Sequence, residues 1–251
     1  MNVNNAVANS ANARAADAEA AITPLVLIPG LACTAEMFVP QIAALSPHRP
    51  VTVASIVEGD SMAQMAAAIL RDAPPRFALG GISMGGYIAF EILRQAQERV
   101  ERLALLSTTA RPDAPEQTVQ RQALIERVDA GELEVLLREV SPRLVHPLHK
   151  DDQTLIDTQV RMGLEIGVAG FIRQQKASIK RADSRPDLPA IRIPTLVLVG
   201  DRDPLTPPIR SREMADALPD ACLVVVADCG HASTLEQPAA VNKALAEWLA
   251  A

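Results

Sequence analysis

The sequence predicts an α/β fold: a mainly parallel sheet of about six strands, helices on both of its faces, and a helical lid insertion. Six short apolar segments have the length and composition of buried strands, and helical stretches separate most of them. Strands that alternate with helices form parallel sheets covered on both sides. Between Ser107 and Thr195, however, 87 residues show helical periodicity and no convincing strand. This long interval is therefore expected to be an insertion into the alternating pattern.

The individual elements are placed by apolar runs, capping signals and prolines. Strands are expected at residues 25–29, 51–54, 77–80, 103–107, 195–199 and 222–227. Helices are expected at residues 36–45, 61–72, 87–94, 208–218 and from residue 238 onward. Ser61-Met62-Ala63-Gln64 is a capping box, and proline is favoured where the helices near Pro208 and Pro238 begin. The last helix carries one apolar face, formed by Val241, Leu245, Trp248 and Leu249.

The long interval is expected to contain several helices that lie over the carboxyl edge of the sheet. Apolar residues follow helical spacing at Leu133, Leu136, Leu137 and Val140, and again at Val168, Phe171 and Ile172. Breaks between helices are expected at Pro142, Pro147 and the pair Asp151-Asp152. We expect residues 24–110 and 191–251 to form the core and residues 111–190 the lid. A separate helical domain is the alternative, since 87 residues can form one.

Composition excludes several classes of partner. The net charge of −6 argues against nucleic acid and anionic membrane surfaces, and no apolar run approaches the roughly 20 residues that span a bilayer. Residues 1–23 are rich in Ala and Asn, lack the apolar core of a signal peptide, and are expected to form a disordered or weakly ordered tail. Three cysteines fit free thiols in a reducing compartment. The expected location is cytoplasmic.

The segment around Ser83 carries the strongest chemical signal. Gly81-Ile82-Ser83-Met84-Gly85 is a G-x-S-x-G motif between an expected strand and an expected helix. Such a turn is too sharp for side chains at the two glycines, and it raises the serine hydroxyl above the end of the sheet. Ser83 is therefore the candidate nucleophile.

A serine hydroxyl is a weak nucleophile at neutral pH and needs a base, which in turn needs an acid to orient it. Of four histidines, His231 directly follows the last expected strand and so lies at the same edge as Ser83. Asp201 and Asp203 both follow the fifth expected strand, and spacing alone does not separate them. We interpret His146 and His149 as surface or packing residues, because no third metal ligand accompanies them. No metal or other cofactor is expected.

An oxyanion that develops during attack needs preorganised donors. The amide of Met84 lies at a helix amino terminus, where a free N–H and the helix dipole favour negative charge. A second donor is expected from the loop after the first strand, where Gly30 permits a sharp turn and the amide of Leu31 is the candidate. Cys33 either lines the pocket or is a small buried apolar residue.

With these residues the chain resembles the α/β-hydrolase family from about residue 25 to its end, apart from the insertion. The order Ser83, acid, His231 matches the family order. The resemblance implies the α/β-hydrolase fold, and it favours Asp203 over Asp201, because the acid usually lies three residues after the glycine of the motif Gly200-Asp201-Arg202-Asp203. Two features depart from the family: Pro29-Gly30 stands where many members have His-Gly, and the leading antiparallel strands have no counterpart.

The nearest resemblance within the family is to small esterases and enol-lactonases, through residues 30–33 and 205–208. We therefore expect a serine hydrolase that acts on a small carboxylic ester or lactone, as a monomer or homodimer. One alternative is hydrolysis of a thioester or carbon–carbon bond, for which an anionic tail could meet basic side chains at Arg173, Lys176, Lys180, Arg181 and Arg185. Another is a ligand-binding protein on the same scaffold.

Overall fold

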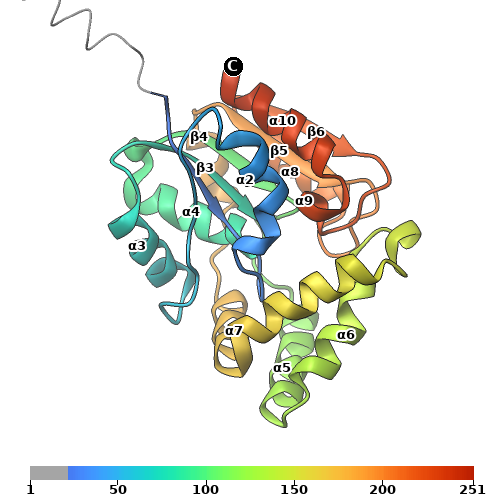
Figure 1. The fold of residues 1–251 in the computed structure, drawn as a ribbon. Helices are drawn as coiled ribbons and strands as arrows, with labels where there is room; N and C mark the ends of the chain where they lie inside the picture. The colour runs from blue at the N-terminus through green and yellow to red at the C-terminus, as the bar shows by residue number, and fades with distance from the viewer. Residues whose placement is uncertain (1–21) are drawn as a thin grey trace, which may run out of the picture.

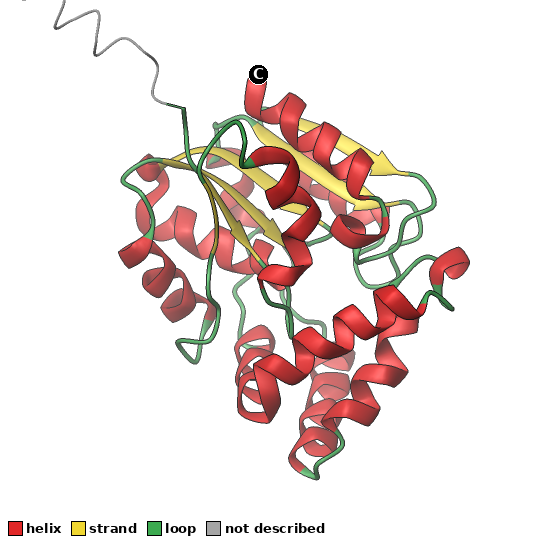
Figure 2. Cartoon of the chain, viewed as in Figure 1, coloured by secondary structure: helices red, strands yellow, loops and turns green. Residues whose placement is uncertain are grey.

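A computed structural model describes residues 22–251, and it contains one six-stranded sheet in which every neighbouring pair is parallel (Figures 1 and 2). Its strands are β1 (Leu25–Ile28), β2 (Val51–Val53), β3 (Phe77–Ile82), β4 (Val100–Leu106), β5 (Thr195–Gly200) and β6 (Ala221–Val226). They lie in the order β2-β1-β3-β4-β5-β6. The predicted fold class and all six predicted strands are confirmed. The expected tail over residues 1–23 lies, except for its last two residues, outside the described residues.

Helices follow most of the strands. The α-helices are α2 (Val39–Leu45), α3 (Met62–Asp72), α4 (Met84–Ala96), α5 (Pro115–Asp129), α6 (Leu133–Leu144), α7 (Gln153–Ile179), α8 (Pro208–Ala217), α9 (Ser233–Glu236) and α10 (Pro238–Ala250). Short 3-10 helices are η1 (Ala35–Phe38), η2 (Gln97–Arg99), η3 (Pro147–His149) and η4 (Arg185–Ala190). Ser61 caps α3 by accepting from the amide of Gln64, as predicted, whereas the Gln64 side chain accepts from Asp60 instead of Ser61.

Successive side chains along each strand point to opposite faces of the sheet, and this alternation divides the core into two layers. One face of the sheet packs on α3, α4 and α8 through residues such as Val26, Leu79 and Leu103. The other face packs on α2 and α10 through residues such as Leu27 and Ala78. The predicted apolar face of α10 is buried. Because both faces are covered, the strand ends are the parts of the sheet left for chemistry.

Three elements differ in detail from expectation. Strand β4 begins at Val100, three residues early, because the charged Glu101 and Arg102 interrupt its apolar pattern while keeping extended backbone. Strand β6 is an edge strand and most of its side chains are partly or fully exposed, instead of buried. Pro142 lies inside the last turn of α6 and does not end that helix.

The interval between β4 and β5 folds as α5, α6 and α7, and it contains no strand in any of its residues, all of which the structure describes. These helices form a group past the carboxyl ends of the central strands (Figure 1). They share a hydrophobic cluster, which includes Leu133, Leu136, Val160 and Phe171 and also Ala32 from the loop after β1. Helix α7 is broken at Gly167, where the backbone has φ 71°. Among residues 22–251, no helix is both long enough and apolar enough to cross a bilayer.

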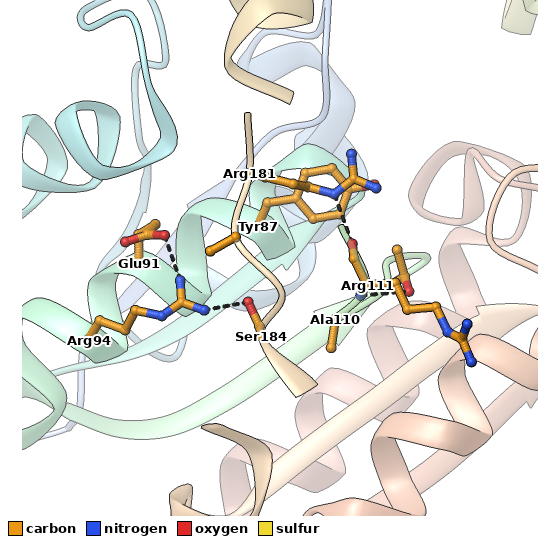
Figure 3. A pocket seen from close by; sticks show the side chains of 9 residues that line it. Tyr87, Glu91, Arg94, Ala110, Arg111, Arg181 and Ser184 are labelled. Atoms are coloured by element: carbon orange, nitrogen blue, oxygen red, sulfur yellow. Dashed lines mark hydrogen bonds and ion pairs between the residues drawn. The ribbon is translucent and has the colours of Figure 1, made fainter. Parts of the chain in front are cut away.

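A buried ion pair joins the two ends of this insert where they meet the core. Asp113 accepts from Arg181, and the two side chains are 1% and 4% exposed. The guanidinium of Arg181 lies 4.3 Å from the ring centroid of Tyr87 on α4 and donates to the carbonyl oxygen of Arg111 (Figure 3). A buried charge is tolerated when it is paired and hydrogen-bonded, so the pair holds the two ends of the insert together beside α4.

We expect Asp113→Ala to lower the free energy of unfolding by about 3–5 kcal/mol, because it leaves the Arg181 charge buried without its carboxylate. Urea denaturation measures this change. The control is Glu134→Ala, which breaks an exposed pair with Arg138 and should cost less than about 0.5 kcal/mol. Equal losses for the two variants would contradict the role given to the buried pair.

Candidate active site

Ser83 lies in a strained turn between β3 and α4. Its backbone has φ 53° and ψ −116°, a conformation that non-glycine residues rarely adopt. A Cβ at Gly81 would lie 2.3 Å from the carbonyl oxygen of Gly85, and one at Gly85 would lie 2.2 Å from that of Ile28. Both contacts are with backbone, so only glycine fits at either position. The steric reason for the G-x-S-x-G pattern is thus visible in the contacts of the turn.

A residue that the sequence analysis missed supports this turn from β4. The hydroxyl of Thr108 donates to the carbonyl oxygen of Ser83 at 2.7 Å. Gly86 makes room for Thr108, because a Cβ there would lie 2.4 Å from the threonine oxygen. No sequence motif marks Thr108; its only signal is its position just after a central strand.

The structure brings Ser83, His231 and Asp203 together from three different strand ends. His231 Nε2 lies 2.9 Å from Ser83 Oγ, and His231 Nδ1 lies 2.9 and 3.0 Å from the two carboxylate oxygens of Asp203. Asp203 and His231 are buried, whereas Ser83 is partly exposed. The hydroxyl is therefore the member of the three that a molecule entering the site can reach.

The surroundings of Asp203 keep it ionised. Its oxygens accept from the amides of Leu205 and Thr206 and from the Thr206 hydroxyl, at 2.8–2.9 Å. Burial by itself would raise the pKa of Asp203, but the charge of protonated His231 and the bonds from His231 and Thr206 together hold it below its ordinary value of 3.8. Asp201 instead accepts from the amide of Cys229 at 3.0 Å and does not contact the imidazole.

A second buried carboxylate, Glu236, holds the loop that carries His231. Its oxygens accept from the amides of Gly230 and Ala232, on either side of His231, and from the amide of His146 at 2.7 Å. His149 Nδ1 lies 3.1 Å from the same carboxylate. Glu236 belongs to the segment that resembles the family's histidine region, but the sequence does not show that it binds backbone amides. His146 and His149 are thus placed in packing contacts with this loop.

One candidate oxyanion donor, the amide of Met84, directly follows Ser83, and the other, that of Leu31, belongs to the loop after β1. A Cβ at Gly30 would lie 3.5 Å from the Cβ of Ser83, so the loop after β1 runs directly against the turn. Among the described residues, neither the amide of Leu31 nor that of Met84 donates to a backbone or side-chain acceptor. Cys33 donates its thiol to the carbonyl oxygen of Leu31 at 3.4 Å, and burial raises the pKa of this thiol to about 12.

Two of the five basic residues proposed for an anionic tail are held in ion pairs. Arg181 is paired with Asp113 and Arg185 with Asp183. Both guanidinium groups are therefore paired with carboxylates of the chain itself.

With this geometry in view, comparison with known proteins identifies the family. A family model described as alpha/beta hydrolase fold matches residues 60–238, more than half of the chain. A relative from Mycobacterium tuberculosis, which carries the name of a non-heme bromoperoxidase, BpoC, is 32% identical over 178 residues, covering 68% of this chain and 66% of the relative. The chain thus spans just under two thirds of that relative's length. The chain belongs to the α/β-hydrolase fold family.

Solved structures show the same relationship over nearly the whole described chain. A thermophilic esterase from Thermogutta terrifontis, studied with malate bound, has 31% identity and a TM-score of 0.82, over 91% of this chain and 89% of that one. The enol-lactonase from Burkholderia xenovorans LB400 has 26% identity and a TM-score of 0.81, over 91% and 92% of the two chains.

The lowered pKa of Asp203 predicts how stability depends on pH. The ionised carboxylate stabilises the folded state above the ordinary carboxyl pKa, and this stabilisation is lost as the pH falls through the lower folded-state value. Between about pH 6 and about pH 3, the unfolding free energy of the wild type should therefore fall more than that of Asp203→Asn. Urea titrations at both pH values measure the difference. Parallel losses in the two proteins would show that the group is not ionised preferentially in the folded state.

Proposed function

We propose that this protein is a serine hydrolase that cleaves a small carboxylic ester or lactone through an acyl-enzyme. The observation that carries the proposal is the continuous contact from Ser83 Oγ through His231 to Asp203. A buried acid, an imidazole and a partly exposed hydroxyl in this order are the arrangement that turns a serine into a nucleophile.

In the proposed reaction, Ser83 Oγ attacks the substrate carbonyl while His231 Nε2 takes its proton. Asp203 accepts a hydrogen bond from Nδ1–H, which leaves Nε2 free to act as base and stabilises the imidazolium that forms. The carbonyl oxygen becomes an oxyanion and is met by the amides of Leu31 and Met84. The imidazolium then gives its proton to the leaving alkoxide oxygen as the carbon–oxygen bond breaks.

Water resolves the acyl-enzyme in the second half of the reaction. His231 removes a proton from a water molecule, which attacks the acyl carbon, and the proton returns to Ser83 Oγ as the acid leaves. Nucleophile, base and oxyanion donors are all groups of the chain, so the proposed chemistry requires no cofactor. With a lactone, the leaving alkoxide stays attached to the acyl group, and one hydroxy acid is released.

The relatives support the ester and lactone class over other acyl groups. Two structures with TM-scores above 0.8 are named as an esterase and an enol-lactonase. The proposed partner is accordingly a small-molecule substrate.

Replacing the nucleophile tests the proposal. Ser83→Ala should lower kcat/KM for p-nitrophenyl acetate by roughly 10³-fold or more, because only binding and oxyanion stabilisation remain. Labelling by a fluorophosphonate probe should disappear with it. The control is Ser211→Ala, a buried serine on α8 whose hydroxyl has no partner among the described residues and whose loss should leave the rate unchanged. A Ser83→Ala variant within tenfold of wild type would exclude this mechanism.

A further inference from the structure

The loop that carries Leu31 has a conformation that its sequence does not favour. The amide of Cys33 donates to the carbonyl oxygen of Gly30 at 3.2 Å, which closes a four-residue turn. Ala32, the third residue of this turn, has φ 57°. That position normally holds glycine or asparagine when φ is positive, because a Cβ is strained there. Contacts from outside the loop must therefore hold Ala32 in place.

Those contacts come from the second part of α7, in the insert. Gln174 Oε1 accepts from the amide of Ala32 at 2.8 Å, and Gln174 Nε2 lies 3.4 Å from the carbonyl oxygen of Ile56. The side chain belongs to a fully buried residue. Ala32 also belongs to the hydrophobic cluster that contains Leu133, Leu136, Val160 and Phe171 of the insert. The insert thus binds the amide of Ala32 and also packs against its side chain.

We infer that Gln174 is a positioning residue for the oxyanion hole, so that the helical insert is required for the chemical step. By binding the amide of Ala32, Gln174 fixes the peptide planes of the turn and leaves the preceding amide, that of Leu31, without an acceptor of its own. A donor fixed in advance stabilises an oxyanion more than one that must reorient. This inference rests on the proposed serine hydrolase function and adds a residue to it.

The chain supplies a matched control in the next residue. Gln175 is also buried, at 3% exposure, and its Oε1 accepts from Arg121 at 2.7 Å, which joins α7 to α5 within the insert. Gln174→Met and Gln175→Met each remove one buried side-chain amide from the same helix. Only the first removes a contact with the loop after β1.

In the full-length protein, Gln174→Met should lower kcat for p-nitrophenyl acetate by about 10- to 100-fold, with KM changed less than about threefold. Its affinity for an aryl trifluoromethyl ketone should fall by the same factor as kcat/KM. Ser83 adds to this ketone, its proton passes to His231, and the carbonyl oxygen becomes an oxyanion. Gln175→Met should keep both quantities within about threefold of wild type. Equal effects of the two variants, or an effect of Gln174→Met on KM alone, would overturn the inference.

Amide NMR of the wild-type protein tests the inference without relying on the stability of a variant. The Ala32 amide should exchange slowly with solvent both before and after the ketone binds, whereas the Leu31 amide should shift downfield on binding. A downfield shift of Ala32 instead would show that Gln174 does not hold this amide. Failure of the proposed function has a different signature, since Ser83→Ala would then retain hydrolysis and no adduct would form with the wild type.

Discussion

The buried carboxylate of Asp203 is the interaction on which the arrangement of the site depends. An ionised carboxylate in a dry interior is very unfavourable unless donors surround it. Thr206 and Leu205 provide donors from the loop after β5, and His231 provides one from the loop after β6. Meeting this requirement fixes both loops relative to each other and fixes which imidazole nitrogen faces Ser83. The position of the His231 ring nitrogen beside the Ser83 hydroxyl therefore follows from the need to surround the Asp203 carboxylate with hydrogen-bond donors.

The insert is attached to the two sides of this centre by different polar contacts. Near the junction of α6 and α7, Glu236 joins the His231 loop to the amide of His146, and the amide of His231 donates to the carbonyl oxygen of Leu144 at 2.7 Å. On the other side, Gln174 bonds the Ala32 turn. Under the proposed function, the insert contacts both the loop of the base and the loop of an oxyanion donor, and it therefore belongs to the reaction centre.

The sequence predicted most of what depends on local pattern and strand order. Parallel strands end at one edge, so Ser83, His231 and the acid loop could be placed together before any contact was known. Asp203 could be preferred to Asp201 only through family resemblance, since the difference lies in which carboxylate turns toward the imidazole. Thr108 and Gln174 could not be predicted for another reason: each bonds to backbone atoms of distant residues, and nothing in its own sequence neighbourhood marks those contacts.

The glycines of the serine turn differ in whether backbone or side-chain atoms prevent their substitution. Gly81 and Gly85 face backbone atoms, and no substitution elsewhere can remove a backbone carbonyl. Gly86 faces the side chain of Thr108, so its restriction is conditional on the identity of that residue. During evolution, positions 81 and 85 can therefore accept no residue other than glycine, whereas positions 86 and 108 can be substituted together. Any lineage that enlarges residue 86 must also find another donor for the carbonyl oxygen of Ser83.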